Sequence, residues 1–310
     1  MRGIFRASII VMIAIVVVAI LLLASSMVPT GKQVLRLGTT TSARDSGLLD
    51  YVLPDFESKY NCQVEVIAVG SGQAMTLGKN GDVDVLIVHS PTAEKQFVKD
   101  GYGTSRTLIA YNQFVIVGPL SDPANVSAAK NATDAFSRIY QSRTEGKATF
   151  VSRGDQSGTD VKEKAVWTAA GFNTTGFNNN WYLSTGQGMG AVLDITEQNT
   201  NGYTLADEAT YWQRNAAGII PHLKIVYQGN PFLFNQYSAI PINPEKWPQV
   251  NSALANQLVQ WVSSPEIQKM IANYSVGGHN VFVPNAGPGA LLEMHPVSSN
   301  WLTMLMVRTC

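Results

Sequence analysis

Four short stretches rich in glycine, serine and threonine could bind an anion. They span 39–42, 70–73, 152–159 and 185–190, and each follows an apolar segment and precedes a stretch of helical character. The first turn of a helix has backbone N–H groups without partners and a partial positive charge. Glycine lets the backbone approach a ligand closely, and hydroxyls can donate to its oxygens. Because four such turns occur in one chain, we predict a shared oxyanion site.

Arg153 is the only arginine within these four turns. Its planar fork of donors suits a tetrahedral dianion, so it is the leading candidate for a ligand-binding side chain. Arg153 could instead pair with Asp155 on a surface loop. Asp155 could also orient Arg153 from behind, or accept a proton from hydrogen phosphate. In the last turn, Gln187 and Met189 could line the site or simply pack.

The segments around the turns predict an α/β fold. Apolar runs typical of buried strands lie at 34–38, 64–69, 83–88, 149–151 and 181–183. Strands that alternate with helices form mainly parallel sheets, and such sheets bind ligands at the carboxyl ends of their strands. Pro54 interrupts a helical pattern at 48–56, so we expect either a kink or a helix that restarts with Pro54 in its first turn.

Two apolar segments, 114–117 and 237–242, bracket the middle third of the chain and each opens onto a Pro or Gly turn. We interpret them as crossings between two lobes. Lobe one then comprises 33–112 plus 243–286, and lobe two comprises 113–242, with the binding cleft between them. A helix at 250–261, with leucines and a tryptophan at helical spacing, would pack on lobe one.

The composition is that of a folded protein of two lobes. The chain has 310 residues, of which 45% are hydrophobic and 14% charged, which provides ample material for packed cores. Lys plus Arg equals Asp plus Glu at 22 each. This balance gives no basic surface for a phosphodiester backbone, so we expect no nucleic-acid partner and an anion site that is local.

The first 32 residues are distinct from the fold. Arg2 and Arg6 precede an uncharged, largely aliphatic run at 7–31, which is typical of a signal peptide or an uncleaved membrane anchor. Either interpretation places 33–310 outside the membrane. The C-terminal tail at 287–310 is interrupted by proline and charges and is a poor membrane span.

Two cysteines, Cys62 and Cys310, permit one disulfide, but their spacing cannot establish it.

Enzyme motifs are absent from the sequence. The stretch 72–79 is one residue too long for a phosphate-binding P-loop, and 186–190 lacks the dinucleotide fingerprint. No nucleophile elbow occurs either. The four histidines are too dispersed to suggest a metal cluster or a triad: His89, His222, His279 and His295. We therefore predict a protein that is not an enzyme and has no cofactor or metal, with an exported phosphatase as the rival, prompted by Ser157 and Arg153 in one loop.

The turns and several flanking motifs resemble the tungstate-binding proteins of tungstate-uptake ABC transporters, within the type II periplasmic-binding-protein fold. The resemblance runs from about Leu35 to Ala286 and rests on the segments 39–42, 46–50, 72–74, 112–119, 152–159, 186–190, 233–235 with Tyr237, and 282–286. It implies a monomeric, two-lobed Venus flytrap with a mainly parallel sheet in each lobe. Such a protein binds tungstate or molybdate outside the membrane and docks on permease subunits.

The resemblance also implies a set of ligand-binding residues. Carried over by motif, the residues that line the oxyanion are Thr40, Thr41, Ser42, Ser71, Arg153, Ser157 and Thr159. Backbone and side-chain groups of the same turns complete the predicted set: Gly158, Gln187, Gly188 and Met189. Asp160 departs from the pattern, which has a histidine there. Phosphate-binding proteins of the superfamily share the Arg153 motif, so phosphate is the alternative cargo, whereas the first and last turns favour tungstate.

Overall fold

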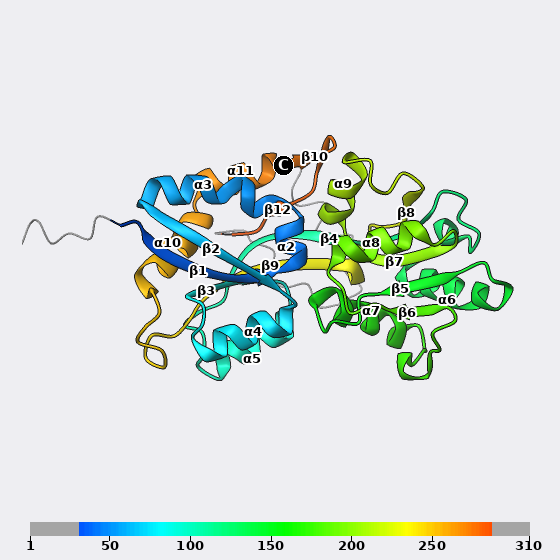
Figure 1. The fold of residues 1–310 in the computed structure, drawn as a ribbon, viewed down its shortest axis with the longest axis horizontal. Coiled ribbons are helices and arrows are strands. Elements are labelled where there is room, and N and C mark those ends of the chain that lie inside the picture. Colours follow the sequence, from blue (N-terminus) through cyan, green and yellow to red (C-terminus); the bar gives the residue numbers. More distant parts are fainter. Residues whose placement is uncertain (1–30, 287–310) are drawn as a thin grey trace, which may run out of the picture.

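A long mixed β-sheet runs through the centre of the molecule in the computed structural model, which describes residues 31–286 (Figure 1). Its main strands follow the order β2-β1-β3-β9-β4-β7-β5-β6, and β8 and β12 also pair with β4. The strands are β1 (Gln33–Thr40), β2 (Cys62–Val69), β3 (Val85–Val88), β4 (Thr107–Pro119), β5 (Thr149–Ser152), β6 (Tyr182–Ser184), β7 (Gly202–Asp207), β8 (Leu223–Tyr227), β9 (Phe234–Pro241) and β12 (Val283–Pro284). A separate hairpin pairs β10 (Ser275–Val276) with β11 (His279–Asn280).

Parallel pairs occupy both ends of this sheet. Strand β1 pairs in parallel with β2 and β3, and β5 pairs in parallel with β6 and β7. Between them, β9 and β4 run antiparallel to their neighbours. The predicted α/β class is confirmed.

Strand β4 joins the two ends of the molecule. Its first part, 107–113, pairs with β9, whereas Phe114–Val117 pair with β7. Its central residues are buried, from Phe114 to Val117, because both faces of the sheet are covered there. One strand therefore passes from one set of neighbours to another at Gln113 and Phe114.

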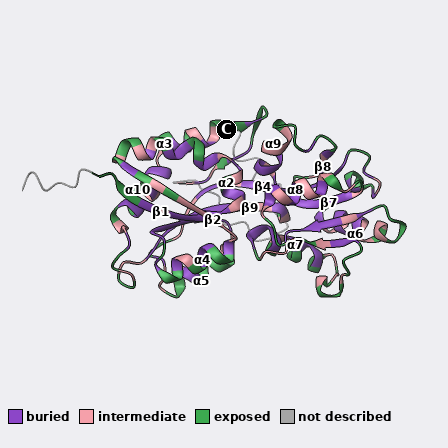
Figure 2. Cartoon of the chain, in the orientation of Figure 1, coloured by how far each residue is buried: buried purple, intermediate pink, exposed green. Residues whose placement is uncertain are grey.

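Helices cover both faces of the sheet, with their exposed sides outward (Figure 2). They are α2 (Thr41–Asp45), α3 (Leu48–Tyr60), α4 (Ser71–Asn80), α5 (Pro91–Lys99), α6 (Ala132–Ser142), α7 (Gly158–Ala169), α8 (Met189–Gln198), α9 (Glu208–Ala216), α10 (Ser252–Val262) and α11 (Pro265–Asn273). Short 3₁₀ turns lie at Val126–Ala128, Arg143–Glu145, Thr174–Gly176 and Pro231–Leu233.

Pro54 lies in the interior of α3, which begins at Leu48. The prediction of a helix that restarts with Pro54 in its first turn is therefore wrong. The chain turns earlier, at Gly47, whose backbone is left-handed with φ of +76°. A Cβ there would lie 2.4 Å from the Tyr274 hydroxyl, so glycine is required at this turn by both conformation and space.

The hydrophobic core falls into two groups. One group packs β1–β3, α3, α10 and α11, and includes Leu254, Leu258 and Trp261 of α10 as the sequence predicts. The other group packs β5–β8 and α6–α8 around Phe150 and Trp167. We call the two parts the first half and the second half, and β4 and β9 connect them (Figure 1).

Several sequence predictions fall outside the described residues. The signal peptide or anchor at 1–32 lies almost wholly there, as do the tail at 287–310 and Cys310. Within 31–286, no helix is long and apolar enough to cross a membrane. Cys62 is buried at the start of β2 and is not in a disulfide with any described residue.

Candidate functional site

The four predicted turns each stand at the carboxyl end of a strand and open a helix. The first half contributes the turns from β1 into α2 and from β2 into α4, and the second half those from β5 into α7 and from β6 into α8. The residues that precede the first helical turns are Thr40, Gly70, Ser157 and Gly188. Because β1 pairs in parallel with β2, and β5 with β6, the turns of each half end at the same edge of the sheet.

The turns of the two halves touch one another. Nη2 of Arg153 donates to Oγ1 of Thr41 over 3.0 Å, and the Gly158 N–H donates to Oγ of Ser71 over 2.9 Å. A Cβ at Gly158 would lie 2.9 Å from the His89 carbonyl oxygen, and one at Gly70 would lie 3.2 Å from the Asp155 carbonyl oxygen. Glycine at these positions lets the halves close to direct contact.

Arg153 lies at the centre of these contacts with only 1% of its surface exposed. Its Nη2 also donates to Oδ2 of Asp155 over 2.5 Å, and its Nη1 reaches Oγ1 of Thr159 at 3.5 Å. The pairing with Asp155 exists, but the surface-loop interpretation is wrong because the guanidinium is buried. Its Nε is buried without a hydrogen-bond partner among residues 31–286. A buried charged donor without an acceptor is costly, so this atom is available for an anion.

The loop between β5 and α7 is held by its own carboxylates. Oδ1 of Asp155 accepts from the Ser157 N–H over 3.1 Å. Asp160 accepts from the N–H groups of Gly154 and Gln156 and from Nζ of Lys164. Asp160, which departs from the family pattern, therefore shapes the loop from inside and is 1% exposed.

Serine and threonine hydroxyls of the first half are buried at the same interface. Thr40, Ser42 and Ser71 are each at most 3% exposed. Oγ1 of Thr40 accepts from the Ala43 N–H and so caps α2. In the second half, Oγ of Ser157 caps α7 in the same way by accepting from the Asp160 N–H. Each cap fixes the direction in which the next backbone N–H groups point.

The last turn contributes backbone rather than side chains. A Cβ at Gly188 would lie 3.4 Å from Oγ1 of Thr41, so this glycine is at the interface. Gln187 is exposed, and its N–H donates to Oγ1 of Thr185. The Met189 side chain is fully buried and packs with core residues of the second half. Of the two interpretations for Met189, the structure favours packing, which leaves its N–H as the group that could face a ligand.

His89 is the residue that sequence reasoning missed. It directly follows β3, it is 3% exposed, and its Nε2 lies 2.9 Å from Oγ of Ser42 and 3.0 Å from Oγ1 of Thr40. The stretch from β3 through His89 into α5 is a fifth junction between a strand and a helix. That pattern could have revealed it, whereas a count of scattered histidines could not.

Behind His89 lies a buried polar chain that connects the halves. Nδ1 of His89 lies 2.9 Å from Oδ1 of Asn235, and Nδ2 of Asn235 donates to Oδ1 of Asn112 and Oδ2 of Asp207. Asp207, the N-cap of α9, also accepts from Asn112 and from the Tyr237 hydroxyl. The Tyr237 ring stacks on the imidazole with centroids 4.8 Å apart.

Burial determines the charge state of the imidazole. Loss of hydration lowers the pKa of His89 to about 4, the bond with Asn235 opposes this shift, and the positive charge of Arg153 adds to it. Burial also raises the pKa of Asp207, against the hydrogen bonds that it accepts. At neutral pH the imidazole is therefore uncharged in this structure.

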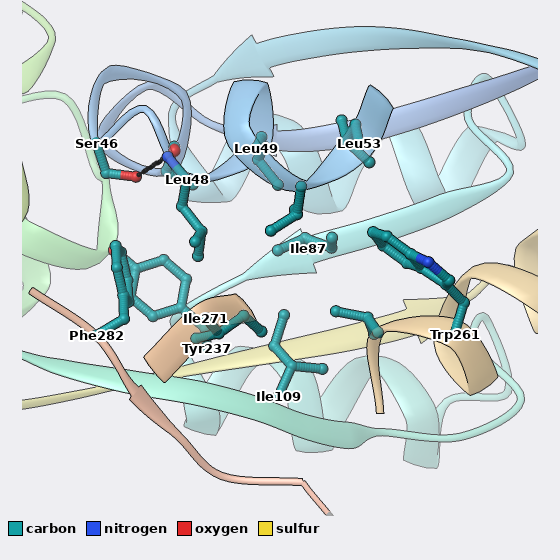
Figure 3. Close-up of a pocket in the computed structure, with 13 residues that line it drawn as sticks. Ser46, Leu48, Leu49, Leu53, Ile87, Ile109, Tyr237, Trp261, Ile271 and Phe282 are labelled. Atoms are coloured by element: carbon teal, nitrogen blue, oxygen red, sulfur yellow. Dashed lines mark hydrogen bonds between the residues drawn. The ribbon is translucent and has the colours of Figure 1, made fainter. Parts of the chain in front are cut away.

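Two cavities adjoin these residues. One, of about 20 Å³, is apolar and lies under α2 and α3 between Leu49, Ile109 and Tyr237 (Figure 3). It has room for about one water molecule, so it is a packing defect rather than a ligand site. The other, of about 300 Å³, is lined by residues of both halves, among them His89, Gly158 and Lys162. It reaches the site from the side of His89.

Comparisons with known proteins agree with this geometry. A family model described as a PBP superfamily domain matches residues 28–266. The chain is 43% identical to a putative ABC transporter anion-binding protein of Haloferax volcanii, over 82% of this chain and 72% of that protein. It is 41% identical to the tungstate-binding protein TupA of Peptoclostridium acidaminophilum, over 81% of this chain and 85% of that one.

Solved structures give the same result. A tungstate-binding protein TupA from Desulfovibrio alaskensis matches with a TM-score of 0.68 and 42% identity, over 82% of this chain and all of that one. A structure described as the tungstate ABC transporter from Geobacter sulfurreducens matches with a TM-score of 0.70 and 46% identity, over 79% of this chain and all of that one.

Proposed function

Since the chain belongs to the periplasmic-binding-protein superfamily and, within it, to the tungstate-binding proteins of ABC transporters, we propose that it binds tungstate between its two halves. The observation that carries the site is the buried Nε of Arg153, which has no partner among the described residues. It lies where four turns from both halves meet. An oxyanion at this place would accept from that donor and from the surrounding amides and hydroxyls.

The helices supply a favourable field for a dianion. Three of the four that start at the site, α4, α7 and α8, have ten or more residues, so each places a partial positive charge at its first turn. Hydroxyl donors come from Thr40, Thr41, Ser42, Ser71 and Thr159. Amide donors come from the turns that contain Gly158, Gln187, Gly188 and Met189, while Ser157 caps α7.

Asp155 bears on the choice of anion. Each of its oxygens already accepts a hydrogen bond, one from Arg153 and one from the Ser157 N–H. We assign it the role of orienting Arg153 rather than that of accepting a proton from hydrogen phosphate. A pocket whose inward groups are donors favours a fully deprotonated dianion, which at neutral pH means tungstate, molybdate or sulfate over phosphate.

Binding between two halves suggests how the protein works in transport. Residues 33–112 with 243–286, and 113–242, would move as two lobes about the strands β4 and β9, and the bound anion would hold them together. The closed monomer would then dock on permease subunits in the membrane. Residues 1–32 would hold it outside the membrane, as a cleaved signal or as an anchor.

An enzymatic role has one feature in its favour, the presence of Ser157 and Arg153 in one loop. Oγ of Ser157 is occupied by the Asp160 N–H, and the nearby imidazole of His89 bonds to Thr40 and Ser42 instead. A serine used as a helix cap is poorly placed to act as a nucleophile. We propose that the protein binds and releases the anion without altering it chemically. Turnover of a chromogenic phosphate ester would contradict this.

Calorimetry of the ligand-free protein with tungstate, molybdate, sulfate and phosphate, at fixed pH and salt, tests the proposal. We expect one-to-one binding of tungstate that is much tighter than binding of phosphate. Tight binding of phosphate with no response to tungstate would instead place this protein with the phosphate receptors.

A further inference from the structure

The hydrogens around His89 can be counted. Nε2 of His89, Oγ1 of Thr40 and Oγ of Ser42 form a buried triangle with sides of 2.9, 3.0 and 3.1 Å. When the imidazole bears one proton, the triangle contains either two hydrogens or three. The number depends on which ring nitrogen bears that proton.

Asp207 determines which ring nitrogen of His89 bears the proton, because it orients the side-chain amides of Asn112 and Asn235. Asn112 and Asn235 both direct their NH₂ groups toward Oδ2 of Asp207, which accepts a hydrogen bond from each. The Oδ1 of Asn235 is then left facing Nδ1 of His89 at 2.9 Å. Nδ1 must therefore carry the proton, and Nε2 presents a lone pair to the two hydroxyls.

A buried lone pair takes a donor, so one of the two hydroxyls must point at Nε2. Only the other hydroxyl is free to donate to an anion. If Nε2 is protonated, it donates to one hydroxyl oxygen, and both hydroxyl hydrogens become available. A fully deprotonated anion, which can only accept, thus gains a donor and a nearby positive charge when the imidazole is charged.

We propose that His89 takes up a proton from the solvent when the anion binds, and that Thr40 and Ser42 then both donate to the anion. The new bond is N–H at Nε2, and the proton comes from the buffer. This inference rests on the proposed function and adds to it a residue that adjusts the pocket to an acceptor-only ligand.

The charged and titratable groups around the ring are consistent with such a change. Arg153 is positive and opposes protonation in the empty protein, and Lys95 and the half-buried Lys162 line the cavity beside His89. Asp207 lies beyond Asn235, and the Tyr237 ring stacks on the imidazole. Burial keeps the pKa of His89 near 4 without an anion, and two added negative charges beside the hydroxyls would raise it.

A cavity adjoins the residue that takes up the proton. His89 and Asn235 line the cavity of about 300 Å³, together with Ser90 and Lys162. We expect the proton to reach the imidazole from this cavity. Burial lowers the pKa of Lys162 to about 8, so this amine is already charged at pH 6 and does not contribute to proton uptake there.

Calorimetry at pH 6 in several buffers with different heats of ionisation measures the protons taken up. When tungstate is titrated into the wild type, the observed enthalpy should change with buffer by an amount that corresponds to about one proton per anion. Between pH 6 and pH 7 the affinity should fall by up to about tenfold. His89→Gln should bind more weakly, with no proton uptake.

His222→Gln is the matched control, because this histidine is 80% exposed and lies far from the turns on the chain. It should keep the proton uptake of the wild type. If His89→Gln fails to bind tungstate, the charge state of His89 can be read from the ¹⁵N resonances of its imidazole in the wild type, measured with and without tungstate. They should change to those of the charged ring.

Tungstate binding without proton uptake would overturn this inference and leave the proposed function standing. Uptake that persists in His89→Gln would overturn it as well, because another group would then be the acceptor. Absence of any tungstate binding would overturn both.

Discussion

Replacement of Arg153 by lysine separates the geometry of the guanidinium from its charge. Lysine keeps one positive charge, but its single Nζ cannot occupy the positions of Nε, Nη1 and Nη2. In the structure these atoms have different partners: Nη2 contacts Asp155 and Thr41, Nη1 reaches Thr159, and Nε has no partner in the described part of the chain. The anion would lose at least the bond from Nε.

One charge-assisted hydrogen bond contributes roughly 1.5–3 kcal/mol. Arg153→Lys should therefore bind tungstate about 10- to 150-fold more weakly than the wild type at the same pH and salt. Isothermal titration calorimetry measures this directly. The control is Arg138→Lys, since Arg138 also pairs with an aspartate of the second half but lies on the surface helix α6. An Arg153→Lys variant within threefold of the wild type would refute the assignment of Nε.

Three further predictions concern closure and stability. Gly158→Ala should weaken tungstate binding by about 5- to 150-fold without lowering the melting temperature. The reason is that a Cβ would lie 2.9 Å from the His89 carbonyl oxygen and so oppose closure of the two halves rather than folding. Calorimetry measures the affinity, and small-angle scattering measures the closure. Burial raises the pKa of Glu163 from its usual 4.5 to about 7, so its contribution to stability is present below pH 4.5 and is lost as the pH rises to about 7. In denaturant titrations at pH 4.5 and pH 7, the wild type should lose ~3 kcal/mol of unfolding free energy between the two pH values, whereas Glu163→Gln should not. The same loss in Glu163→Gln as in the wild type would contradict the assignment to Glu163. Arg106→Ala should cost roughly 3–5 kcal/mol of unfolding free energy because it leaves the carboxylate of Glu94 buried without its cation, whereas a cost below 1 kcal/mol would show that water reaches that site.

The local parts of the site could be predicted from the sequence. Each turn follows an apolar strand and contains the glycine or hydroxyl residue that a helix start requires. A few neighbouring residues are therefore enough to predict its chemistry. Arg153 could be singled out for the same reason. The α/β class followed from the alternation of strands and helices, and the central part of the crossing strand β4 followed from the short apolar run at 114–117.

The relations between distant residues could not be predicted in this way. Ser71 and Gly158 are 87 positions apart, and His89 and Asn235 are 146 apart, yet each pair is joined by a hydrogen bond. Such contacts depend on how the two halves face each other, which no local pattern records. Of the two alternatives for Pro54, the restarted helix was wrong for a related reason: packing of α3 on the core outweighs the local cost of a proline inside the helix.

The location of the anion is the central claim, and anomalous diffraction at a tungsten absorption edge tests it most directly. Crystals grown with tungstate should show one strong anomalous peak within hydrogen-bond distance of Nε of Arg153, between the turns of the two halves. A peak elsewhere, such as the cavity beside Lys162, or no peak under conditions where calorimetry detects binding, would contradict the account.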